Sequence, residues 1–135
     1  MKKFLYVLCI LCAYAVSPMV LGESEGHGGG AGGNYKEITP PFVVNLPDPH
    51  QTRFMQVTVA LSAKNEEALK AIDTHMPLLR NNLIMLFTSQ EQDVIKTREG
   101  REKLRADAQE VVNKALKQVD APPIDALYFT SLVVQ

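Results

Sequence analysis

The sequence predicts an α+β domain, in which a small antiparallel sheet carries two main helices on one of its faces. Residues 53–62 alternate between apolar and polar, which is the period of a strand covered on one side. Two later segments, 65–86 and 97–118, repeat apolar residues every three or four positions, which is the period of an amphipathic helix. Residues 127–134 form a strongly β-prone run. The order strand–strand–helix–helix–strand favours helices grouped on one face of one sheet.

Residues 1–22 are expected to be a signal peptide or an N-terminal membrane anchor. Lys2 and Lys3 form a basic start, and residues 4–21 follow without a charge. Cleavage after Gly22 fits this layout, with Ala13-Tyr14-Ala15 as a second candidate site. A retained anchor also stays open, because 18 uncharged residues reach the lower limit of a bilayer span. Both alternatives place the rest of the chain outside the cytoplasm.

Residues 23–35 are expected to be a flexible tether, because a glycine-rich segment cannot bury a core. No strand precedes this segment and no Gly-Lys-Ser/Thr follows it, so a phosphate-binding loop is not indicated. The expected folded domain is residues 36–135, a length of about 100 residues that suits one small domain. Cys9 and Cys12 precede it, in the apolar run, where they are expected to be filler without redox or zinc chemistry.

The first two strands are expected to form a hairpin. The first, Ile38–Leu46, contains Pro40 and Pro41, which favour a sheet edge or a late start of the strand. The second is Arg53–Ser62, and the turn-rich residues 47–52 separate the two. The core side of the second strand is expected to hold its alternating apolar residues, Met55, Val57, Val59 and Leu61.

Both helices have predicted ends and apolar stripes. Asn65 is expected to cap the first helix and Pro77 either to kink it or to begin a new one. The second is expected from Thr97 to about Gln118, where Asp120-Ala121-Pro122-Pro123 ends it. The first stripe consists of Leu69, Ile72, Met76, Leu79, Leu83 and Leu86. The second stripe consists of Leu104, Ala108, Val111, Ala115 and Leu116. The final run, 127–134, is expected to pair with the hairpin or to bind another surface.

Neither a catalytic site nor a metal or cofactor site is predicted. The domain's two histidines, His50 and His75, lack the i, i+4 spacing of a helical metal pair. The charge balance, 14 Lys and Arg against 15 Asp and Glu, gives no basic footprint for nucleic acid. The alternating charges of residues 96–105 are typical of a solvated helix face, with a partner-binding face as the alternative.

Arg80 and Asn81 are the candidate interaction residues. They lie between Leu79 and Leu83 of the apolar stripe, and a guanidinium beside an amide suits recognition of a partner. Arg80 is one position, about 100°, beyond Leu79 on a helix, so it is expected beside the core and to serve assembly more than folding.

Five segments in order carry a family resemblance. They are Pro41-Phe42-Val43-Val44-Asn45-Leu46, Arg53-Phe54-Met55-Gln56-Val57-Thr58-Val59, His75-Met76-Pro77-Leu78-Leu79-Arg80-Asn81 through Leu86, Thr97-Arg98-Glu99-Gly100-Arg101-Glu102-Lys103-Leu104-Arg105, and Tyr128-Phe129-Thr130-Ser131-Leu132-Val133-Val134-Gln135. Together they resemble the FliL family of flagellar basal-body-associated proteins, or a shorter paralogue of it, because only three residues precede the apolar run.

The resemblance implies a periplasmic domain similar to the stomatin-type fold and a non-enzymatic structural accessory of the bacterial flagellar motor. Such an accessory would support stator function, motility, swarming and chemotaxis from the inner membrane and periplasm at the basal body. Its implied partners are flagellar motor stator and basal-body proteins and further copies of itself, with no cofactor. The rival hypotheses are an exported periplasmic binding or scaffold domain unrelated to the flagellum, and an exported hydrolase.

Overall fold

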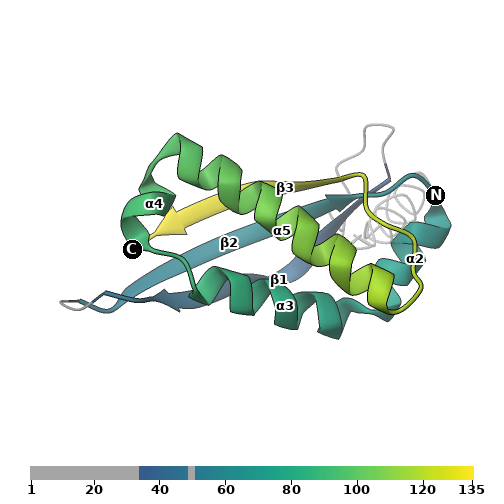
Figure 1. Ribbon diagram of the computed structural model, residues 1–135, viewed down its shortest axis with the longest axis horizontal. Helices are drawn as coiled ribbons and strands as arrows, with labels where there is room; N and C mark the ends of the chain where they lie inside the picture. Colours follow the sequence, from purple (N-terminus) through teal and green to yellow (C-terminus); the bar gives the residue numbers. More distant parts are fainter. Residues whose placement is uncertain (1–33, 49–50) are drawn as a thin grey trace, which may run out of the picture. The chain divides into compact units, whose positions relative to one another are not determined.

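The computed structural model describes residues 34–48 and 51–135. The expected signal or anchor, 1–22, lies outside the described residues, as do His50 and most of the expected tether, 23–35. The described part is an α+β domain, as predicted, and its helices lie between β2 and β3 in the chain (Figure 1). The elements are β1 (Tyr35–Leu46), β2 (Arg53–Ser62), α2 (Glu66–Thr74), α3 (Met76–Thr88), α4 (Gln92–Lys96), α5 (Arg98–Gln118) and β3 (Ala126–Val134).

The three strands form an antiparallel sheet in the order β1-β2-β3, with helices α3 and α5 over one face (Figure 1). The predicted alternation of β2 is confirmed, since the four apolar residues of its core side are 0% exposed: Met55, Val57, Val59 and Leu61. Phe54 and Gln56 lie on the other side of the strand and are exposed. One sheet face is therefore the wall of the core, and no helix of the described residues buries the other.

Strand β1 is an edge strand, as its prolines predicted, but it begins at Tyr35, three residues before the expected start. Its pairing with β2 jumps from Ile38↔Val59 to Phe42↔Val57. Two extra residues therefore bulge out of β1 around Pro40. Because the number of extra residues is even, Ile38 and Phe42 both still point into the core, at 0% and 1% exposure.

Strand β3 pairs with the free edge of β2, so the predicted pairing of the last run with the hairpin is confirmed. Its register with β2 shifts by one residue, from Thr58↔Ser131 to Val59↔Phe129, which leaves Thr130 as a bulge. A shift of one residue reverses the alternation. The side facing the core is consequently Leu127 and Phe129 before the bulge but Leu132 and Val134 after it.

The predicted first helix is two helices, so Pro77 begins a new helix and does not kink one. Asn65 caps α2 as expected, because its Oδ1 accepts a hydrogen bond of 2.9 Å from the amide of Ala68. Helix α3 then begins at Met76, and Pro77 occupies its first turn, where a missing N–H costs no intrahelical bond. Phe87 is 0% exposed while Leu86 is only half-buried, which corrects the end of the predicted stripe.

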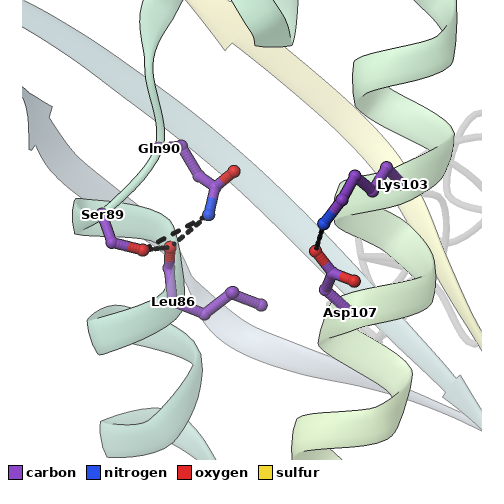
Figure 2. A network of polar contacts seen from close by, with 5 residues as sticks. All are labelled: Leu86, Ser89, Gln90, Lys103 and Asp107. Carbon is purple, nitrogen blue, oxygen red and sulfur yellow. Dashed lines mark hydrogen bonds and ion pairs between the residues drawn. The ribbon is translucent and has the colours of Figure 1, made fainter.

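The end of α3 is closed by side chains that bond to its last carbonyls. The hydroxyl of Ser89 donates to the carbonyl oxygen of Leu86 at 2.8 Å, and the Gln90 amide donates to the same oxygen at 2.9 Å (Figure 2). Helix α4, of five residues, follows and was not predicted. On α5, Lys103 and Asp107 form an ion pair of 2.6 Å one turn apart (Figure 2).

Helices α4 and α5 meet at a tight corner around Gly100. Thr97 caps α5, since its Oγ1 accepts from the Gly100 amide at 3.0 Å and donates to the Val94 carbonyl oxygen at 2.8 Å. A Cβ on Gly100 would lie 1.9 Å from that carbonyl oxygen, far inside contact distance. Only glycine lets α4 and α5 approach this closely.

The core side of α5 differs from the predicted stripe at one position. Val112 is buried at 0% exposure, whereas Val111 is half-buried. The helix ends at Gln118, as predicted, and Asp120 follows with a φ of 53°, the left-handed conformation that ends many helices. Asn113 then accepts a hydrogen bond of 2.8 Å from the Ile124 amide, which fastens the connection to β3 against α5.

We expect Leu83→Asp to unfold the domain. Leu83 is 0% exposed, so the carboxylate of an aspartate at this position would be buried without a partner. This would lower the free energy of unfolding by on the order of 4 kcal/mol. Met85→Asp is the matched control, because Met85 lies on the same helix and is 65% exposed. Thermal melts should show little folded Leu83→Asp protein and a nearly unchanged midpoint for Met85→Asp. Equal melting of both variants would contradict the assignment of α3 to the core.

We expect Gly100→Ala to lower stability by about 2 kcal/mol, or roughly 10 °C in melting temperature. Alanine favours a helix over glycine by about 1 kcal/mol, but the overlap with the Val94 carbonyl forces the α4–α5 corner apart. Lys114→Ala, at an exposed position of the same helix, should shift the midpoint far less. If Gly100→Ala melts at or above the parent temperature, the corner is not tight.

Candidate interaction surfaces

Arg80 links α3 to the bulge of β1. Its Nη1 donates a hydrogen bond of 2.7 Å to the carbonyl oxygen of Pro40, and its guanidinium carbon lies 4.5 Å from the centre of the Phe42 ring. The side chain is half-buried beside the core stripe, where its helical position had placed it. The sequence did not indicate these two contacts, and they give Arg80 a role within the fold in addition to any role in assembly.

A row of aromatic rings continues inward from Arg80. The Phe87 ring packs edge-on to Phe42 at 5.2 Å between centroids, and to Phe129 at 6.0 Å. Phe42 belongs to β1 and Phe129 to β3, so the row crosses the sheet from edge to edge. Arg80 therefore lies at the β1 end of a row of packed aromatic rings.

Asn81 and Asn82 follow Arg80 in the chain but differ in their surroundings. Asn82 is half-buried, and its amide donates 2.9 Å back to the carbonyl oxygen of Leu78 in the preceding turn. Asn81 is exposed. Of the two predicted interaction residues, Asn81 is thus the one whose side chain is open to a partner, while Arg80 is partly occupied by Pro40 and Phe42.

The sheet face opposite the helices, here called the open face, carries large apolar side chains that were not predicted from the sequence as interaction residues. They come from all three strands and are 43–64% exposed: Tyr35, Val43, Phe54, Tyr128 and Val133. Tyr35 and Tyr128 lie 6.0 Å apart between ring centroids, across β2. Period-two alternation could have identified Phe54, which falls between core residues of β2. Exposed apolar side chains gathered on one face are typical of a protein-binding surface.

A second surface is a groove between α5 and β3. It has a volume of about 530 Å³, and its helix side is formed by Arg101, Glu102 and Arg105. Arg105 donates from Nε to Glu102 at 3.2 Å and from Nη1 to the carbonyl oxygen of Leu127 at 3.4 Å. These residues belong to the charged run 96–105. Arg101 and Glu102 are exposed, so this part of the run is a solvated helix face that also borders the groove.

The described residues contain no group of three or more metal-binding side chains. His75 is half-buried at the junction of α2 and α3, where its amide donates 3.0 Å to the carbonyl oxygen of Ala71. Within the same described part, no helix combines the length and the apolar character that crossing a membrane requires. The main surface features of the described residues are the exposed apolar side chains of the open face and the groove between α5 and β3.

Comparison with known proteins places the chain in a family. The family described as "Flagellar basal body-associated protein FliL" matches residues 35–135. The flagellar protein FliL of Aquifex aeolicus is 30% identical over 99 residues, which are 73% of this chain and 60% of that protein. The flagellar protein LafL of Vibrio parahaemolyticus is 27% identical over 94 residues, or 69% of this chain and 57% of LafL.

The Escherichia coli K12 protein FliL is 29% identical over 75 residues, which cover 56% of this chain and 47% of that protein. The matched part of this chain thus spans between about half and three-fifths of the length of these curated relatives. The family match, over residues 35–135, includes every strand and helix described above. The chain belongs to the FliL family of non-enzymatic flagellar basal body-associated proteins.

Proposed function

We propose that this chain is a non-enzymatic structural accessory of the bacterial flagellar motor that supports stator function, and through it motility, swarming and chemotaxis. The observation that carries the proposal is the family match over residues 35–135, which takes in the complete sheet and all of its covering helices. A domain with a continuous apolar core and exposed apolar side chains on one face suits a role in assembly.

The proposed partners are stator and basal-body proteins and further copies of this chain. Two surfaces are suited to such contacts: the open face of the sheet, and the Arg80–Asn81 region of α3. Aromatic and arginine side chains contribute most to binding when a partner excludes water from them. On α3, Asn81 would form the polar contact, and Arg80 would hold the surface in shape through Pro40 and Phe42.

The proposed location is the periplasm and the inner membrane at the flagellar basal body. Residues 1–22 would be a signal peptide or an anchor, and residues 23–35 a spacer between it and the domain. Support comes from Lys2 and Lys3, which favour a cytoplasmic start, followed by Glu23 and Glu25 beyond the apolar run.

We expect an alkaline phosphatase fused after Gln135 to be active in cells. That enzyme folds only in an oxidising compartment, and the proposed location puts Gln135 in the periplasm, which is oxidising. A reporter that works only in the cytoplasm should be inactive at the same junction. The opposite pair of results would contradict the proposed location. N-terminal sequencing of the mature protein would decide between cleavage after Gly22 and a retained anchor.

We expect Asn81→Ala to weaken self-assembly and swarming without changing the melting temperature, because Asn81 is exposed. Arg80→Ala is a poorer probe, since it also removes a charged hydrogen bond and should cost about 1–2 kcal/mol of stability. Sedimentation velocity and swarm-plate diameter are the measurements. Gln118→Ala, an exposed amide at the far end of α5, is the matched control.

Normal oligomers and normal swarming for Asn81→Ala would remove the Arg80–Asn81 region from the proposed interface. Equal loss for Asn81→Ala and Gln118→Ala would show that the effect is not specific to α3.

A further inference from the structure

The outer edge of β3 presents unpaired backbone groups. Phe54 and Gln135 exchange two backbone hydrogen bonds, of 3.0 and 2.9 Å. In an antiparallel pair such residues alternate with residues that bond on the other side. Leu132 and Val134 therefore direct their N–H and C=O groups away from β2. No other strand of the described residues lies on that side.

In contrast, the opposite edge of the sheet, along β1, is obstructed. Pro40 and Pro41 have no N–H to offer, and the bulge distorts β1 where they lie. Arg80 also occupies the carbonyl oxygen of Pro40. An incoming strand can thus extend this sheet on the β3 side but is obstructed on the β1 side.

Basic side chains of α4 and α5 border the open edge. The groove of about 530 Å³ is lined by Arg101, Glu102 and Arg105 on α5 and by residues 128–132 of β3. An adjoining hollow of about 270 Å³ shares Arg101 and Glu102 and adds Lys96 and Arg98. In Figure 1 the amino-terminal half of α5 lies along the β3 side of the sheet.

The charges along this border are mostly positive. Four cations line the two hollows against one carboxylate, Glu102, which Arg105 already contacts at 3.2 Å. Asp93 lies 3.8 Å from Lys96, at the limit of an ion pair. Arg101 donates from Nε to the carbonyl oxygen of Ile95 at 2.8 Å. That bond fixes its position and leaves its two outer nitrogens for a carboxylate.

We propose that an extended, acidic segment of a partner protein adds to β3 as a fourth strand of the sheet. Its backbone would pair with Leu132 and Val134, and its carboxylates would meet Arg101, Arg98 and Lys96. Main-chain bonds to a free edge supply affinity in such complexes, and the side chains beside the edge supply specificity. The inference deepens the proposed function, on which it rests, by giving the chemistry of one partner.

A second copy of this chain fits the edge less well than an acidic segment. Two β3 strands paired about a twofold axis would continue one sheet, with both α5 helices on the same face. The cations of the two α5 helices would then approach one another across the junction. Like charges so placed oppose association.

The test measures binding of a defined probe to the full chain, purified in detergent. The probe is an eight-residue peptide of alternating glutamate and threonine. Its two controls are the same peptide with lysine for glutamate, and one methylated on every backbone nitrogen, which has no backbone N–H left to donate along either edge. We expect only the parent peptide to bind, and we expect residue-resolved hydrogen exchange to slow at Leu132 and Val134.

Protein variants test the charged border. Arg98→Glu should weaken binding of the peptide at least tenfold, and it should fold normally because an acid suits the first turn of a helix. Arg101→Glu should weaken binding as well. Lys114→Glu makes the same change of charge at an exposed position of α5 outside both hollows, and should bind like the parent.

Absence of binding, equal binding of the lysine peptide, or binding that leaves exchange at Leu132 and Val134 unchanged would overturn the inference. So would a parent chain that dimerises through β3. These results concern the edge alone, so they would leave the accessory role to be judged by motility. If the chain binds the peptide as expected but has no effect on motility, the proposed function would be contradicted instead.

Discussion

The packing of Phe87 is the contact on which the rest of this domain depends. Its ring is 0% exposed and meets Phe42 of β1 at 5.2 Å and Phe129 of β3 at 6.0 Å. One residue of α3 thereby joins both outer strands across β2. Burial of apolar area is the main favourable term in folding, and a buried Phe contributes about 2–3 kcal/mol. Because helices pack on it in this way, one face of the sheet is buried in the core.

The surfaces left outside the core, namely the opposite face and the two edges of the sheet, determine what the domain can bind. The opposite face keeps exposed apolar side chains such as Tyr35, Val43 and Phe54. The two edges differ, because Arg80 and the prolines close β1, while no strand of the described residues pairs with the outer side of β3. The open face and the β3 edge are thus the surfaces left for partners, and the chain belongs to a non-enzymatic flagellar family.

Sequence patterns predicted the elements whose signals are local. The alternation of β2, the Asn65 cap and the beginning of the last helix near Thr97 depend on near neighbours, and the structure confirms them. Helix α4 was not predicted because its five residues are too few to show a helical repeat of apolar positions. The choice of Phe87 over Leu86 and of Val112 over Val111 depends on tertiary contacts. The bond from Arg80 to Pro40 joins residues 40 positions apart, which no local pattern reveals.

The central claim is that this domain serves the flagellar motor without catalysing a reaction. Its most direct test is deletion of the gene from its native bacterium, with filament assembly and swarming scored together. The account predicts that filaments still form, that swarming is reduced, and that the intact chain restores it. Unchanged swarming in the deletion strain, under conditions where the chain is normally made, would contradict the account.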